Sequence, residues 1–118
     1  MSEPVYFLLE VEIKPGEMDK FKALVNEMVK AAQNEPKTLN YEWNLSEDGK
    51  TCHVYERYAD SEALLVHFGS FGKNFAERFL SVVNPTRLMV YGNPSDEAKE
   101  VMGGFGPVYM APIGGFAR

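Results

Sequence analysis

Three side chains that could move a proton or hold an anion lie close together in this sequence. Glu56 and Tyr58 are two positions apart in an alternating segment, and His67 follows on the next segment. Residues two apart on a strand share one face, so Glu56 and Tyr58 are predicted to point the same way. An imidazole ordinarily titrates near neutral pH, which makes His67 the candidate base for a phenolic proton. The alternative is a histidine hydrogen-bonded to Glu56 or Tyr58 within the core.

Two charged residues are candidates for supporting roles in the same chemistry. Glu56 could orient His67 or bind a substrate, and the alternative is a structural salt bridge to Arg57 or Arg87. Arg87 carries a permanent positive charge and could stabilise an oxyanion. The alternative for Arg87 is an ion pair on the surface or at a subunit interface. With these alternatives open, His67, Glu56 and Arg87 form the predicted catalytic set.

Aromatic residues are plentiful, with eight Phe, six Tyr and one Trp. The polar atoms of Tyr and Trp need partners when buried, so a pocket for a flat ligand is a reasonable expectation. Tyr41, Trp43 and Tyr55 either line that pocket or form the seam of a dimer. Asn40 and Asn44 alternate to the face opposite Trp43. The full predicted substrate-binding set is Tyr58, Tyr41, Trp43, Tyr55, Phe68, Phe71 and Phe75.

The sequence does not predict a disulfide, a metal site or a dinucleotide-binding site. Cys52 is the only cysteine, which excludes an internal disulfide and a multi-cysteine metal site. We expect a buried thiol there, because free cysteine behaves as a small apolar residue. The two histidines, His53 and His67, are well separated, so no zinc site is predicted. No glycine-rich dinucleotide fingerprint opens a helix after a strand.

Periodic apolar residues divide the chain into short strands and helices. Alternation predicts strands over residues 5–13, 39–45, 51–58 and 87–91. Helical spacing predicts a helix from Met18 to Ala32 and a short one, capped by Asp60 or Ser61, that ends at Phe68. Residues 69–72 are predicted to break it, before a second short helix that carries Phe75 and Phe79. A last helix is predicted to begin with Asn93 as cap and Pro94 at its first position.

This order of elements predicts an α+β fold. It is the ferredoxin-like β-α-β-β-α-β arrangement, an antiparallel sheet with helices on one face. The other face is too apolar to leave in water, which favours a homodimer with sheet facing sheet. A single domain spans residues 1–118, with a core over 5–91 and a C-terminal helix and tail over 93–118. The apolar tail is predicted to pack as a further strand on its own or a neighbouring subunit.

Charge and hydropathy narrow the possible partners and location. The net charge of −5 opposes binding to nucleic acid, which needs a basic face. No apolar run approaches the roughly 20 residues of a membrane span. The N-terminus lacks the pattern of a signal peptide, so a cytoplasmic protein is expected.

Motifs in order and spacing resemble the antibiotic biosynthesis monooxygenase family. They are Lys14-Pro15-Gly16, Glu35-Pro36 before the strand with Tyr41, Tyr55-Glu56-x-Tyr58-x-Asp60, and Ala63-Leu64-x-x-His67-Phe68. The resemblance covers residues 5–91 and implies a dimeric α+β barrel with one pocket in each subunit. It also implies monooxygenation, by O2, of a small phenolic, quinol or anthrone-like compound without a cofactor. A phenolate or enolate can give an electron to oxygen directly. The protein must therefore deprotonate the substrate, stabilise the resulting anion and exclude water.

The sequence departs from the haem-degrading branch of that family. That branch uses an Asn on the first strand with a Trp and a His on the helices, whereas residues 5–13 contain no Asn and the predicted helices no Trp. His67 stands about where that branch has its Trp. Tyr58 replaces the Trp that the family more often carries at the end of the third strand. The resemblance therefore favours oxygenation over haem degradation, and the alternative is a non-catalytic small-molecule-binding or stress-response protein.

Overall fold

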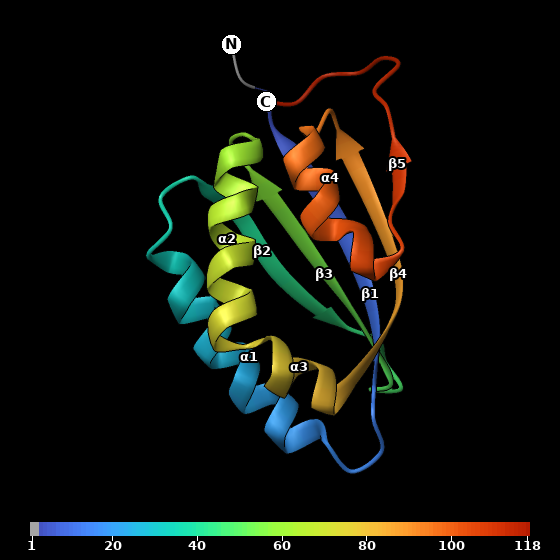
Figure 1. Ribbon diagram of the computed structural model, residues 1–118. Coiled ribbons are helices and arrows are strands. Elements are labelled where there is room, and N and C mark those ends of the chain that lie inside the picture. Colours follow the sequence, from blue (N-terminus) through green and yellow to red (C-terminus); the bar gives the residue numbers. More distant parts are fainter. Residues whose placement is uncertain (1–2) are drawn as a thin grey trace.

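A computed structural model describes residues 3–118 as one five-stranded sheet with helices packed on one face (Figure 1). The strands are β1 (Val5–Ile13), β2 (Thr38–Leu45), β3 (Thr51–Tyr58), β4 (Val83–Gly92) and β5 (Val108–Met110). The helices are α1 (Met18–Gln33), α2 (Ser61–Asn74), α3 (Ala76–Val82) and α4 (Asp96–Met102), followed by a 3-10 turn over Gly103–Phe105. None of these helices is both long and apolar enough to cross a membrane.

The sheet has the strand order β2-β3-β1-β4-β5. The first four strands pair in antiparallel fashion, and β5 adds to the outer edge of β4 in parallel. This confirms the predicted α+β, ferredoxin-like fold. The tail does form a further strand, and it lies on the sheet of its own chain.

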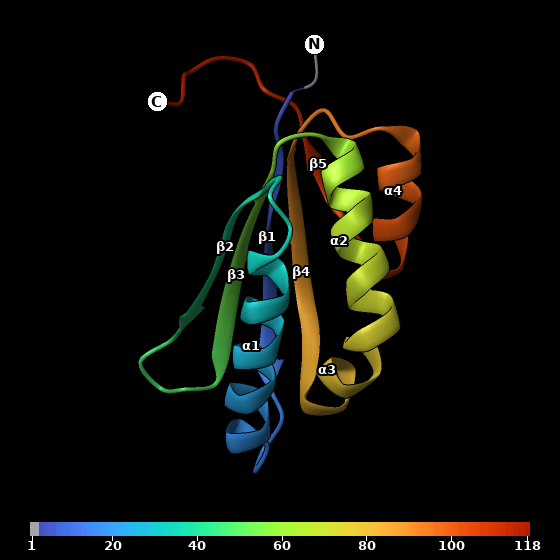
Figure 2. The same ribbon diagram turned by 90° about the vertical axis from the view of Figure 1, so that its left-hand side faces the viewer.

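The two faces of the sheet differ because side chains alternate along each strand. On β1 the odd positions from Val5 to Val11 are buried beneath the helices. Helix α1 covers this face with Phe21, Leu24 and Met28, which recur at helical spacing. The opposite face carries no helix of its own chain, as Figure 2 shows from the side. We call it the open face.

The C-terminal boundary of helix α2 differs from the prediction. Helix α2 continues through Gly69 and Gly72 to Asn74 instead of ending at Phe68. Both glycines face open space, while Phe68 and Phe71 pack against the core and hold the helix in place. Tertiary packing here outweighs the poor helix propensity of glycine.

The last helix and the fourth strand also differ from expectation. Ser95, not Asn93, caps α4, because its side chain accepts a hydrogen bond from the amide of Ala98. Strand β4 begins at Val83 and includes Pro85, which lies where the pairing with β1 shifts register between Glu10 and Val11. A bulge accommodates proline within a sheet because fewer ladder hydrogen bonds are required there.

Candidate active site

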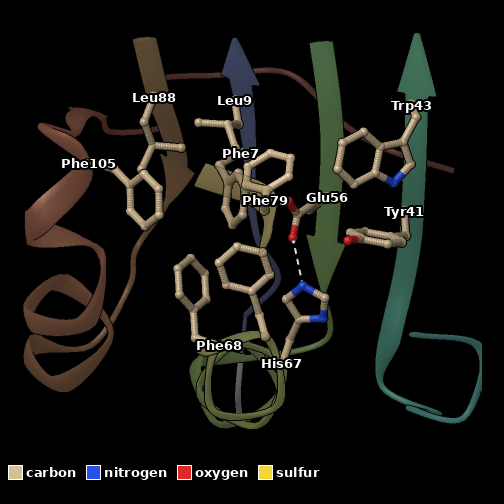
Figure 3. A pocket seen from close by; sticks show the side chains of 11 residues that line it. Phe7, Leu9, Tyr41, Trp43, Glu56, His67, Phe68, Phe79, Leu88 and Phe105 are labelled. Atoms are coloured by element: carbon tan, nitrogen blue, oxygen red, sulfur yellow. Dashed lines mark ion pairs between the residues drawn. The ribbon is translucent and has the colours of Figure 1, made fainter. Parts of the chain in front are cut away.

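A narrow cavity lies between the helix-covered face of the sheet and helix α2 (Figure 3). Its volume is about 30 Å³. Most of its wall is aromatic or aliphatic. The lining residues are Phe7, Leu9, Tyr41, Trp43, Glu56, His67, Phe68, Phe71, Phe79, Leu88 and Phe105.

Two carboxyl groups flank the imidazole of His67. Its Nδ1 lies 2.9 Å from Oε1 of Glu35, and its Nε2 lies 3.3 Å from Oε1 of Glu56. The Tyr58 hydroxyl donates a hydrogen bond to that same oxygen of Glu56. Because a carboxylate only accepts hydrogen bonds, Glu35 fixes the proton of a neutral His67 on Nδ1. The lone pair of Nε2 then faces Glu56 at the cavity wall.

Burial shifts the pKa of two groups in the cavity wall, Glu56 and Tyr41. Glu56 is 5% exposed. Burial raises the pKa of Glu56, opposed in part by the charge that His67 can carry and by the hydrogen bond from Tyr58. Burial also raises the pKa of Tyr41, and the nearby Glu56 and Glu35 add to that effect. Tyr41 is therefore a neutral hydrogen-bond donor at physiological pH.

Local structure explains why these side chains meet. Glu56 and Tyr58 follow the alternation of β3 onto the helix-covered face, and Tyr41 lies opposite Glu56 in the register of β2 with β3. Asp60 accepts a hydrogen bond from the amide of Ala63 and so begins α2, which brings His67 over the sheet about two turns later.

A second hydrogen bond, from Thr38, holds the Glu35 carboxylate in place beside His67. Glu35 lies in the link between α1 and β2, and the hydroxyl of Thr38, the first residue of β2, donates to its Oε1 at 2.9 Å. That oxygen therefore accepts from both Thr38 and His67, which restrains the carboxylate against the imidazole.

Trp43 contributes the one buried side-chain donor within residues 3–118 that has no hydrogen-bond partner, its indole Nε1. The Trp43 ring packs edge-on against Tyr41 at 5.5 Å and against Phe79 at 5.9 Å. A buried N–H without a partner costs about 1–3 kcal/mol, so its position in a cavity wall is suited to a ligand that carries an acceptor.

Most of the predicted site residues come together. His67, Glu56, Tyr41, Trp43, Phe68 and Phe71 line the cavity, and Tyr58 contacts it through Glu56. Both interpretations of His67 fit the structure. Its imidazole contacts Glu56, and it also lines the cavity.

Three predicted residues lie elsewhere. Arg87 pairs in register with Glu10, and Tyr55 pairs with Leu8, so both side chains belong to the open face, across the sheet from His67. The same geometry rules out the alternative salt bridge from Glu56 to Arg57 or Arg87. Phe75 packs against the core between α2 and α3 and does not line the cavity.

Sequence reasoning missed Glu35 as a functional residue. The sequence singles it out only as part of the Glu35-Pro36 motif. Its contact with His67 joins positions 32 residues apart, and strand or helix periodicity carries no information about such a contact. Phe7, Phe79 and Phe105 also line the cavity and were not among the predicted site residues. Across residues 3–118, no group of three or more His, Cys, Asp or Glu side chains is arranged to hold a metal ion.

Solved structures with the same fold align with between 75% and 98% of the chain. MupZ from Pseudomonas fluorescens aligns with a TM-score of 0.85 and 22% identity, over 98% of this chain and 95% of MupZ. Rv0793 from Mycobacterium tuberculosis aligns with a TM-score of 0.69 and 26% identity, over 81% of this chain and 99% of its own. A putative antibiotic biosynthesis monooxygenase from Caulobacter crescentus aligns with a TM-score of 0.65 and 20% identity, over 75% of this chain and 86% of its own.

Sequence comparison places the chain within a family. Among curated proteins, none matches it. The sequence pattern described as antibiotic biosynthesis monooxygenase matches residues 4–77, which include Glu35, Glu56 and His67. The chain therefore belongs to the antibiotic biosynthesis monooxygenase family.

Proposed function

We propose that this protein is a cofactor-independent monooxygenase that oxidises a small phenolic, quinol or anthrone-like compound in the cavity. The observation that carries the proposal is an imidazole held between two carboxyl groups in the wall of an aromatic cavity. Such a site can remove a proton from a flat substrate and keep the resulting anion away from water. Membership of the family supports oxygen as the second substrate.

In the proposed reaction His67 acts as the base. Its Nε2 takes the proton of the Glu56 carboxyl group as Glu56 accepts one from a phenolic or enolic hydroxyl, and Glu35 stabilises the positive charge that develops on the imidazole. The anion then transfers one electron to O2, and the two radicals combine to a peroxide at the substrate carbon. Loss of water from the peroxide leaves a carbonyl, so one oxygen atom stays in the product and the other leaves with two hydrogens.

Neutral donors at the cavity wall would stabilise the substrate anion. Tyr41 remains protonated because burial raises its pKa, and the Trp43 N–H has no partner within residues 3–118. Neutral donors in a water-excluded site stabilise a developing oxyanion without adding a counter-charge. Tyr41 and Trp43 take over the role that the sequence suggested for Arg87.

Oxygen uptake with a panel of quinols and anthrones tests the proposal. We expect His67→Gln to lower kcat by about 10²–10⁴-fold, the usual contribution of a general base. His53→Gln is the matched control, because His53 pairs with Glu10 on the open face. Uptake no faster than in buffer across the panel, or equal rates in both variants, would rule out this function.

A non-catalytic role in binding a small aromatic molecule is the second candidate. The unpartnered Trp43 N–H favours it, because a hydrogen-bond acceptor on a ligand is enough to satisfy that donor. Trp43 is the only tryptophan, so its fluorescence reports directly on occupancy of the cavity. Quenching by a quinol without oxygen uptake would identify a binding protein, whereas quenching with uptake supports the monooxygenase.

We further propose that a second copy of the chain covers the open face. Tyr6 stacks on Tyr91 there with ring centroids 5.3 Å apart, and Tyr6 meets the edge of Tyr55 at 6.3 Å. Leu8 and Met89 extend this apolar surface, and all five side chains remain partly exposed in the single chain. An apolar surface of this kind is typical of a subunit interface.

A further inference from the structure

His67 separates two spaces in the molecule. On its Nε2 side is the aromatic cavity with Glu56. On its Nδ1 side Glu35 borders an outer groove of about 230 Å³ between the α1–β2 link and α2. The groove is lined by Glu35, Pro36, Lys37, Thr38, Glu62, Ala63 and Val66. Figure 3 shows the inner side of this arrangement, with the imidazole directed from α2 toward Glu56 on β3.

We propose that Glu35, His67 and Glu56 form a proton relay that connects the outer groove with the cavity. The contacts of 2.9 Å and 3.3 Å on opposite ring nitrogens give the relay its two steps. Glu35 reaches toward solvent with a side chain that is 13% exposed, whereas the imidazole and Glu56 are enclosed. The relay therefore runs from the partly exposed carboxylate of Glu35, through the two ring nitrogens of His67, to the buried carboxyl group of Glu56.

The aromatic wall explains why a relay is needed. Phe7, Phe68 and Phe79 offer no group that can accept or carry a proton, and their apolar rings disfavour water in the cavity. A proton released near Glu56 can leave along the relay without the cavity having to open. The same route can supply a proton from outside.

An outward transfer followed by an inward transfer returns all three groups of the relay to their starting protonation states. Outward, Nε2 accepts a proton from Glu56 while the proton on Nδ1 passes to Glu35, which leaves His67 as the Nε2–H tautomer. Inward, Glu35 returns a proton to Nδ1 while Nε2–H gives its proton to Glu56, which restores the first tautomer. The proposed oxygenation uses both directions, because the substrate loses protons and the departing water gains them.

The groups that face the relay come from every element around it. Glu56 and Tyr58 approach from β3, Tyr41 and Thr38 from β2, and Glu35 from the link before β2. Lys37 and Glu62 border the groove at its outer end. Tyr58 donates to Glu56, and Tyr41 packs edge-on against the imidazole at 5.1 Å, so neither takes the proton from Nδ1.

The relay can be tested in the protein without substrate, although its use in turnover rests on the proposed function. Imidazole-¹⁵N histidine labelling gives signals for only two rings, His67 and His53. Exchange of their N–H protons with water is measured by NMR in the wild type and in Glu35→Gln. Glutamine keeps an oxygen for Nδ1–H but does not accept the proton, so we expect His67 exchange to slow by about tenfold or more.

A matched pair of controls separates the relay from a general loss of structure. Glu10→Gln removes the carboxylate partner of His53 on the open face and is expected to leave His67 unchanged. Glu35→Ala leaves space beside the groove, and added formate should restore fast exchange there but not in Glu35→Gln. If Glu35→Gln fails to fold, Glu35→Ala with and without formate decides the question.

Each outcome bears on the relay separately from the oxygenase activity. Unchanged His67 exchange in Glu35→Gln, or no response of Glu35→Ala to formate, would overturn the relay. Slowed exchange together with formate rescue supports it, even if no quinol is oxidised. Conversely, oxygen uptake with an unaltered exchange rate would leave the oxygenase standing and require another route for the proton.

Discussion

Glu56 is a carboxyl group whose burial opposes its own charge. It lies in the wall of an aromatic cavity, with Tyr58 and His67 as its polar neighbours. Burial raises its pKa above the ordinary value of 4.5, despite the opposing effect of both neighbours. A group whose pKa is higher in the folded chain binds its proton more tightly there. Its contribution to stability is therefore present at low pH and lost as the pH rises.

The first prediction compares the wild type with Glu56→Gln, which keeps the shape and an acceptor for Tyr58. Above the unfolded value of 4.5, the unfolded wild-type chain releases the proton first, so wild-type stability falls relative to the variant. The relative loss is about 1.4 kcal/mol for each unit by which the folded pKa is raised. Urea unfolding of both proteins between about pH 4 and pH 8 measures it.

Glu12→Gln provides the control for this experiment, since Glu12 is an exposed residue of β1. Its stability relative to the wild type should depend little on pH. A constant difference between wild type and Glu56→Gln over the same range would mean that Glu56 is not held neutral by burial.

At the scale of single residues, the sequence predicts what strand alternation determines. Glu56 and Tyr58 had to share a face, and Asn40 and Asn44 had to lie opposite Trp43. Alternation does not say which face the helices cover, so the alternatives for Arg87 and Tyr55 stayed open; both lie on the open face, which fits the interface alternative and not the cavity. The contact between Glu35 and His67 could not be predicted from alternation either, because only the packing of α2 brings His67 next to Glu35.

Helix α2 is the element that positions His67, and it does so with two glycines in its interior. Gly69 and Gly72 are exposed, and a Cβ built on either meets nothing within 4 Å. Local propensity predicted a break, but the buried side of the helix holds Ala63, Leu64 and His67 in the core. Apolar packing over several turns contributes more free energy than two glycines cost.

The second prediction is that Gly69→Ala stabilises the protein by about 1 kcal/mol, the usual difference between glycine and alanine inside a helix. Nothing in the fold resists the added methyl group. Chemical denaturation gives the change in the free energy of unfolding. Oxygen uptake should be unaltered, because residue 69 points away from the cavity wall.

Gly92→Ala is the matched comparison on the sheet. Gly92 has a φ of 93°, and a Cβ there would lie 2.6 Å from the carbonyl oxygen of Pro4. A left-handed conformation alone costs a non-glycine residue about 1–2 kcal/mol, and the clash adds to it. We therefore expect the same Gly→Ala change to destabilise at 92 and stabilise at 69, and a shared sign would contradict this account.

On the scale of the whole molecule, the chain leaves apolar surface on one side. Helices cover one face of the sheet, and the open face carries Tyr6, Leu8, Tyr55, Met89 and Tyr91. Beyond β5 the last residues extend from the sheet on the side away from α2 and α4 (Figure 2). They include Ile113 and Phe116, both largely exposed. A second copy would cover both the face and this segment.

The final prediction concerns that second copy. Leu8 lies at the centre of the open face, paired in register with Tyr55 on one side and Met89 on the other. Leu8→Glu would place a carboxylate within the proposed interface, where a buried unpaired charge costs several kcal/mol. Sedimentation velocity should therefore show wild-type dimers and Leu8→Glu monomers. Val101→Glu introduces the same charge at an exposed site on α4 and should leave the dimer intact. If Leu8→Glu sediments like the wild type, the open face is not the contact between copies.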